Sequence, residues 1–445
     1  MARDLAARLH VAAGRLFVAL WLLVVLDLGL DSIVLRRIAE GVLALLMGLA
    51  FLNASRHIRV LAALLAVGTA TLAWRAGEWS VLDRGLRAAL AVGAFLPVVG
   101  LVRATVYASP TVAAIRDRVG AMSAAERRTW MTGGAQMLGS ILTLGYVSVQ
   151  RPMLPTELDA SERLSLAECG IRGLGLSMCW SPFFVASAVA SQLVPGVAAW
   201  RIVVLGLALS ALGGGIAHLM FNRALDLRSF GRALQRLGPI VAPTVLLVGA
   251  VIATSSATGW NVLHSVIVVV PACCVAYLLV RAPTRLGRVL GEVVGTSGRM
   301  GDEVLILTAS TIFGAAMAGL AIPDGAAQWL RGVGDLPWLV IGLAVAVITA
   351  LGMLGLHPMV SASVIVPGYV AIGLPVADLV LSHIVVLAWS LSAMVAAWTL
   401  PLVVTSAAFD VPVRRLVFGA NLRFVVIYGF AAVCLLVGLN ALLIG

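Results

Sequence analysis

Long apolar runs separated by short polar connections make up almost the whole chain of 445 residues. A helix needs about 20 mostly apolar residues to cross a bilayer, and many of the runs reach that length. Candidate spans lie at 15–31, 38–53, 58–75, 86–103, 131–149, 171–195, 198–219, 239–257, 263–280, 302–321, 337–356, 358–374, 380–403 and 424–444. The pattern predicts an all-α polytopic membrane protein with about 11–14 hydrophobic segments.

Composition supports this class. The chain is 61% hydrophobic and 11% charged, with a mean hydropathy of +1.06, whereas soluble domains are about 25% charged. The net charge of +11 comes entirely from arginine, since lysine is absent. The arginines gather in short connections such as "RDRVGAMSAAERR", which is the pattern of cytoplasmic loops, so no nucleic-acid partner is expected.

Arginine-rich connections also predict orientation. Because such loops stay in the cytoplasm, we expect an inner-membrane, multi-pass protein with a cytoplasmic N-terminus and an uncleaved first span. The segments expected in the cytoplasm are 103–128, 223–236, 281–299 and 414–423. The connections expected on the opposite side are 76–85, 150–168, 256–262 and 322–336, with half-spans or hairpins allowed among the candidate segments.

Three pairs of similar segments indicate an internal duplication. "GLVRATVYASPTVAAIRDRVG" resembles "YLLVRAPTRLGRVLGEVVG", "WSPFFVASAVA" resembles "LHPMVSASVIV", and "DLRSFGRALQRLG" resembles "DVPVRRLVFGANLR", in the same order. We therefore expect repeats at 86–257 and 263–445 behind an N-terminal three-span extension, 1–85. Transporter repeats are often inverted, but the two arginine-rich arms argue for the same orientation, so both arrangements remain open.

One pair places a proline inside an apolar segment of each half: Ser181–Pro182 and His357–Pro358. Proline breaks a helix and leaves backbone groups unbonded, which membrane proteins tolerate around a cavity. Hydroxyl residues at matching positions, Ser187 and Ser363, together with Ser361, make the two breaks candidate substrate ligands. The alternative is a plain proline kink in which each serine bonds its own helix.

A second pair of segments is rich in small and hydroxyl residues. "GGAQMLGSILTLG" contains Ser140 and Thr143, and "GDEVLILTASTIFG" contains Thr308, Ser310 and Thr311. These segments are candidates for re-entrant hairpins whose tips offer hydroxyls to a substrate. Close helix packing through small residues explains the same composition.

Ionisable residues inside spans are functional candidates. His357 is the candidate for ion coupling because its charge changes near neutral pH, with a neutral histidine bonded to a carbonyl as the alternative. Arg172 is a candidate ligand for a substrate carboxylate if its helix begins inside the membrane. If that helix begins at the interface, Arg172 and Glu168, four residues apart, form a solvated pair. His218 and His383 are weaker candidates.

Motifs of several enzyme classes are absent. The sequence has no Walker A, HExxH, GxSxG or CxxC pattern, and its five cysteines lack metal-ligand spacing. We therefore expect no enzyme activity, no cofactor and no bound metal.

The arginine-rich arm before each Gly/Ser/Thr segment, followed by a broken helix, resembles the ion-transporter superfamily of secondary carriers. This superfamily includes dicarboxylate, citrate, arsenite and tripartite-carrier membrane subunits. The resemblance covers about residues 86 to 445 and implies a small solute, favouring an anion, carried with a proton or sodium gradient between the two broken helices. The alternative is a membrane enzyme or an assembly subunit without transport. The lipid bilayer is the expected partner, and a homodimer is left open.

Overall fold

The computed structural model describes residues 2–108, 123–151, 154–155, 157–221, 227–318, 325, 328, 331–332 and 336–444. Helices and no strands occur in these residues, so the all-α class is confirmed. Nine of the described helices or helix pairs are long and apolar enough to cross a membrane. Two shorter apolar helices, Pro337–Met353 and Pro358–Ile372, join them. The chain is therefore consistent with a multi-pass membrane protein.

The described residues form two compact units, and each is described by itself. Unit 1 comprises residues 1–108, 258–332 and 362–374. Its helices are α1 (Ala2–Leu30), α2 (Ile33–Asn53), α3 (Arg56–Ala76), α4 (Ser80–Ala108), α12 (Val262–Arg281), the 3-10 turn η3 (Pro283–Arg285), α13 (Leu286–Ser297), α14 (Gly301–Ala318) and most of α17 (Pro358–Ile372). Within this unit α14 packs against α2, α3 and α4, and α1 packs against α2, α4 and α13.

Close backbone contact fixes α1 against the end of α13. A Cβ on Gly298 would lie 1.9 Å from the His10 carbonyl oxygen, so the two segments touch where a side chain would not fit. Trp21 Nε1 donates to the Ile267 carbonyl at 2.7 Å and joins α1 to α12. Arg37 links α2 to α4, because it bonds Glu40 at 2.8 Å and Asp83 at 2.6 Å.

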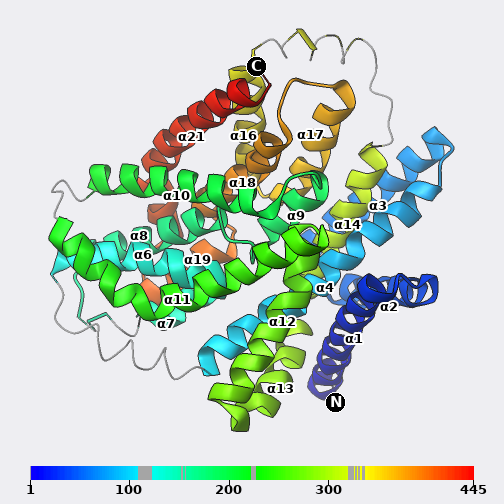
Figure 1. Ribbon diagram of the computed structural model, residues 1–445, viewed down its shortest axis with the longest axis horizontal. Helices are drawn as coiled ribbons and strands as arrows, with labels where there is room; N and C mark the ends of the chain where they lie inside the picture. Colours follow the sequence, from blue (N-terminus) through cyan, green and yellow to red (C-terminus); the bar gives the residue numbers. More distant parts are fainter. Residues whose placement is uncertain are drawn as a thin grey trace. The chain divides into compact units, whose positions relative to one another are not determined.

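Unit 2 comprises residues 109–257, 333–361 and 375–445. Its helices are α6 (Ala124–Leu142), η1 (Thr143–Gly145), α7 (Tyr146–Gln150), α8 (Ala160–Met178), α9 (Val185–Leu193), α10 (Ala199–Phe221), α11 (Leu227–Thr258), α16 (Pro337–Met353), α18 (Asp378–Val395), α19 (Leu400–Phe409), α20 (Val413–Phe418) and α21 (Ala420–Ile444). The boundary between the units falls inside α17. Figure 1 shows α16, α18 and α21 packed together, with α6 beside α8.

Helices α6 and α7 lie side by side within the candidate span 131–149, the segment for which the sequence also suggested a re-entrant hairpin. The side-chain amide of Gln150 donates to the Trp130 carbonyl at 3.4 Å, so α7 returns beside the first half of α6. Arg127 Nε also bonds Glu162 at 2.8 Å. The sides of the membrane on which the connections 103–128 and 150–168 lie stay a prediction. The backbone between α6 and α7 has a positive φ of 51° at Thr143, which interrupts the helix inside an apolar run long enough to cross.

Elements occur in the same order in the two predicted repeats. A long helix, α4 or α12, precedes the arm, and α6 or α14 follows it. Two helices separated by a break come next, α8–α9 or α16–α17, and then α10 or α18–α19 and a last long helix, α11 or α21. The compact units cut across the boundaries 86–257 and 263–445, so the duplication stays a prediction. Residues 109–122 and 222–226 of the arginine-rich arms lie outside the described residues.

Candidate functional site

The first helix break lies between α8 and α9 in unit 2, at residues 179–184. Ser181 Oγ donates to the Ser140 carbonyl at 2.6 Å and accepts from the Phe183 amide at 3.2 Å. Ser187 Oγ donates to the Ser181 carbonyl at 2.7 Å. The structure thus brings together three predicted site residues, Ser140, Ser181 and Ser187, and all three are buried. Pro182 follows Ser181 in the break, where its missing N–H prevents a continuous helix.

Thr143 stands at the turn that joins α6 to α7. Its backbone has φ 51° and ψ −114°, a conformation that a β-branched residue rarely adopts. Its Oγ1 donates to the Leu142 carbonyl at 2.7 Å. The neighbouring helix is held in place because Tyr146 shares a hydrogen bond of 3.1 Å with Thr405 of α19. The turn therefore holds a strained residue about one helical turn from Ser140.

Thr143→Gly should raise the free energy of unfolding by about 1 kcal/mol, because glycine adopts a positive φ without a steric penalty. Unfolding of the purified protein in detergent measures the change. Thr311→Gly is the matched control: Thr311 lies inside α14, so the substitution should lower stability. Destabilisation by both substitutions would contradict strain at Thr143.

The second break lies between α16 and α17. Gly355 has φ 102°, and Pro358 is the first residue of α17. The His357 ring meets the Trp389 ring edge-on, with centroids 5.0 Å apart. Its Nδ1 accepts weakly from the Met359 amide at 3.4 Å. Ser361 Oγ donates to the Pro358 carbonyl at 3.2 Å, so the hydroxyl bonds its own helix.

One stretch of α18 contacts both breaks. Ser390 Oγ donates to the Gly175 carbonyl of α8 at 2.7 Å, one turn before the first break. Trp389 lies against His357 of the second break. A Cβ on Gly352 would lie 2.5 Å from Ser392 Oγ, so the end of α16 touches α18 directly. Ser392 Oγ is buried and has no hydrogen-bond partner among the described residues. Three residues within one turn of α18, Trp389, Ser390 and Ser392, therefore contact both broken segments.

The hydroxyl residues of the second Gly/Ser/Thr segment lie in unit 1. Thr308, Ser310 and Ser363 are buried, and their hydroxyls have no hydrogen-bond partner within the described part of the chain. Ser363 Cβ lies 2.9 Å from the position of a Cβ on Gly314, one turn beyond Ser310, so α17 packs closely on α14. Thr311 differs, because its Oγ1 donates to the Leu307 carbonyl at 2.9 Å. Three buried hydroxyls without partners mark this as a second group of candidate ligands.

Arg172 is engaged within the protein. Its Nη2 donates to Glu168 at 2.8 Å, and its guanidinium lies 3.7 Å from the centre of the Phe221 ring. Both charged side chains are buried, with exposed fractions of 3% and 8%. A Cβ on Gly419 would lie 3.2 Å from Glu168 Oε1, which leaves little room for a substrate beside the carboxylate. This geometry favours an internal pair over a ligand for a substrate carboxylate.

Asp159 begins the helix that carries Arg172. Its carboxylate accepts from the amides of Ser161 and Glu162, both at 2.8 Å. The Glu162 amide, with Ser161 and Arg163 adding to its effect, holds the pKa of the Asp159 carboxyl below its ordinary value. A charged N-cap therefore fixes the start of α8 near neutral pH.

Sequence reasoning missed α18, because 380–403 looks like an ordinary apolar span. Its serines at 390 and 392 were the signal, since their hydroxyls need partners in an apolar segment. His383, a weaker candidate, is buried, with ring nitrogens 2.8 Å from the Leu379 carbonyl and 3.1 Å from the Ile202 carbonyl. It joins α18 to α10 as a structural residue.

No protein-family model matches the chain, and no curated protein matches its sequence.

Proposed function

We propose that the protein is a secondary transporter, which uses a proton or sodium gradient to move a small solute. An anion is the favoured class of solute. The observation that carries the proposal is the contact of α18 with both helix breaks through residues 389–392. Interrupted helices supply backbone and hydroxyl ligands at membrane depth, and paired breaks are typical of carrier sites. The preference for an anion rests on the resemblance to secondary carriers.

The candidate residues are assigned to substrate binding and to ion coupling. Ser140, Ser181 and Ser187 at the first break, and His357, Pro358 and Ser361 at the second, are the proposed substrate ligands. The buried hydroxyls of Thr308, Ser310 and Ser363, which have no hydrogen-bond partner among the described residues, form a separate group of proposed ligands in unit 1. His357 is the proposed proton-coupling residue, since it touches α18 directly and is the element that distinguishes the second break from the first.

The reversal of α6–α7 supports a membrane arrangement for the proposed carrier. If this hairpin enters and leaves on one side, the crossings in the first repeat are α4, α8–α9, α10 and α11. The second repeat has the corresponding α12, α16–α17, α18–α19 and α21, if α14 also belongs to a hairpin that enters and leaves on one side. An even number of crossings gives both repeats the same orientation. This orientation agrees with the expectation that the arginine-rich arms of both repeats lie in the cytoplasm of an inner-membrane protein.

Gradient-driven uptake tests the function. Proteoliposomes containing the full chain are supplied with a panel of labelled carboxylates and inorganic anions, with an imposed sodium gradient, proton gradient or neither. We expect uptake of at least one anion above empty liposomes, increased by one gradient. Absence of gradient-driven uptake across the panel would overturn the proposal and favour a membrane enzyme or assembly subunit.

His357→Gln separates the two driving ions. If protons drive uptake through His357, uptake by the variant should no longer respond to an imposed pH gradient. The variant should still be incorporated into the liposomes in the wild-type amount. The matched control is His383→Gln, because His383 is also buried and its ring nitrogens already contact the Ser382 hydroxyl and the Leu379 and Ile202 carbonyls. A pH response unchanged in His357→Gln would exclude this residue from coupling.

A further inference from the structure

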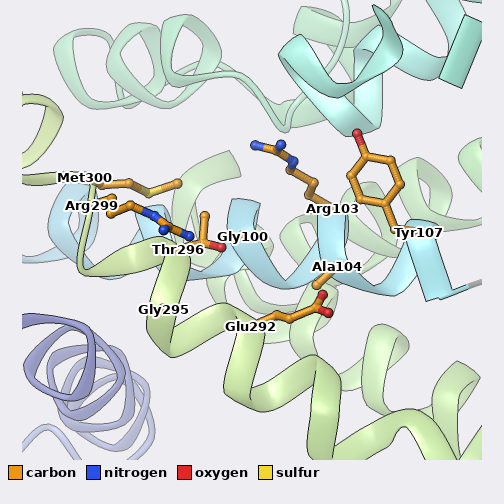
Figure 2. A pocket seen from close by; sticks show the side chains of 9 residues that line it. All are labelled: Gly100, Arg103, Ala104, Tyr107, Glu292, Gly295, Thr296, Arg299 and Met300. Carbon is orange, nitrogen blue, oxygen red and sulfur yellow. The ribbon is translucent and has the colours of Figure 1, made fainter. Parts of the chain in front are cut away.

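A basic pocket lies in unit 1, apart from both helix breaks. It has a volume of about 520 Å³ and lies between α4 and α13. Arg103 and Tyr107 line it from α4, Thr296 lines it from α13, and Arg299 lines it just beyond that helix. Figure 2 shows the two arginine side chains extending from these two segments, with Gly100 and Thr296 between them. Gly100, Ala104 and Gly295 also line the pocket, and these small residues leave open space beside the two guanidinium groups.

The charges around the pocket favour an anion. Among the described residues neither Arg103 nor Arg299 forms an ion pair; Arg103 lies over the Tyr107 ring at 5.7 Å. One carboxylate, that of Glu292, lines the pocket, and Arg288 engages it at 3.0 Å. Arg285 adds a further positive charge nearby, where its Nη1 donates to the Ala108 carbonyl at 2.6 Å. The pocket is therefore positive overall.

The surroundings suit the headgroup region of a membrane. Arg103, Ala104 and Tyr107 of the pocket lie in the last two turns of α4, which is long and apolar enough to span. Helix α13 buries Val289 and Val293, while Leu290 is 45% exposed beside the exposed Arg288. A helix with exposed leucine and arginine side by side is typical of the interface, where arginine reaches phosphate groups.

We propose that this pocket binds the phosphate group of an anionic molecule, either a lipid headgroup or a small soluble phosphate. Two arginines with free guanidinium forks match phosphate oxygens in pairs, which a lone ammonium does not. The Thr296 hydroxyl supplies a neutral donor between them. An open pocket at the expected cytoplasmic face meets anionic lipids, which attract clustered arginines.

Two binding measurements on the full chain in neutral detergent test the site. Native mass spectrometry compares dioleoylphosphatidylglycerol with dioleoylphosphatidylcholine, and thermal unfolding compares inorganic phosphate with chloride at equal ionic strength. The pocket variant is Arg103→Gln with Arg299→Gln. The control, Arg414→Gln with Arg415→Gln, removes the same charge from exposed arginines of α20.

For a lipid ligand, we expect the protein to prefer phosphatidylglycerol by about tenfold or more, from two arginines acting on one headgroup. The pocket variant should lose most of this preference, and the control should stay within about twofold. For a soluble ligand, inorganic phosphate should raise the unfolding temperature of the wild type and the control only. The proposal is overturned if the pocket variant retains both the lipid preference and the response to phosphate.

Arginine-to-lysine variants test whether weaker binding by the glutamine variant comes from a folding defect. Arg103→Lys with Arg299→Lys keeps both charges but removes the planar forks, so its binding should fall between the wild type and the glutamine variant. Because both arginines are exposed, the variants should unfold at the wild-type temperature without ligand. Lysine variants that bind as weakly as the glutamine variants would contradict a charge-based site.

Discussion

Glu168→Ala is expected to lower the free energy of unfolding by about 3–5 kcal/mol, because it leaves Arg172 charged, buried and unpaired. The Arg172 side chain is 3% exposed, and its Nε already lacks a hydrogen-bond partner within the described residues. Removing Glu168 takes away the 2.8 Å contact and, among the described residues, leaves the Phe221 and Phe424 rings against the guanidinium. Chemical unfolding in detergent micelles measures the loss.

A double variant distinguishes a buried charge from a general packing defect. Glu168→Leu with Arg172→Met removes both charges and keeps apolar volume, so it should cost much less than Glu168→Ala alone. Arg84→Ala is the surface control, since its pair with Glu78 is more than half exposed on both sides and should change stability by less than about 1 kcal/mol. Equal losses in the single and double Glu168 variants would contradict the buried-charge argument.

The membrane class and the two helix breaks could be read from the sequence because their causes are local. Apolar runs report on the bilayer, and a proline lacks the N–H that a continuous helix needs. The breaks at 179–184 and 354–357 accordingly lie beside Pro182 and Pro358. The grouping of Ser140 with Ser181 was predicted only as a shared role. The 2.6 Å bond between them depends on how α6 packs on α8.

Long-range contacts could not be read from the sequence. The composition of the segment that contains Thr143 suggested a re-entrant hairpin but fitted close helix packing equally well. The contacts of α7 with α6 and α19 join residues that are distant in the sequence. Close helix approach is equally hidden. A Cβ on Gly206 would lie 2.0 Å from the Cys179 carbonyl oxygen, so α10 lies directly on the first break. Glycines without such contacts look the same in the sequence.

The second large effect concerns uptake, under the proposed transport function. Ser181→Ala is expected to reduce the uptake rate about tenfold or more, since it leaves the Ser140 carbonyl and the Phe183 amide without their partner. A buried backbone group that loses its bond costs about 1–3 kcal/mol, and 1.4 kcal/mol corresponds to a tenfold change. The lost hydrogen bonds should disturb the geometry of the first break, where the proposed substrate ligands lie, and so slow uptake. Initial rates of gradient-driven uptake, corrected for reconstituted protein, measure it.

Ser191→Ala is the matched control, because Ser191 is equally buried in α9 but donates only to the Ala188 carbonyl of its own helix at 2.8 Å. Its uptake should stay within about twofold of the wild type, since the acceptor carbonyl keeps its place in the helix. The unfolding temperature of each variant should be measured alongside its uptake rate, because a general loss of folded protein would lower both rates together. If Ser181→Ala transports as fast as Ser191→Ala, the bond between the hairpin turn and the first break does not organise the transport site, and the ligands must be sought at the second break.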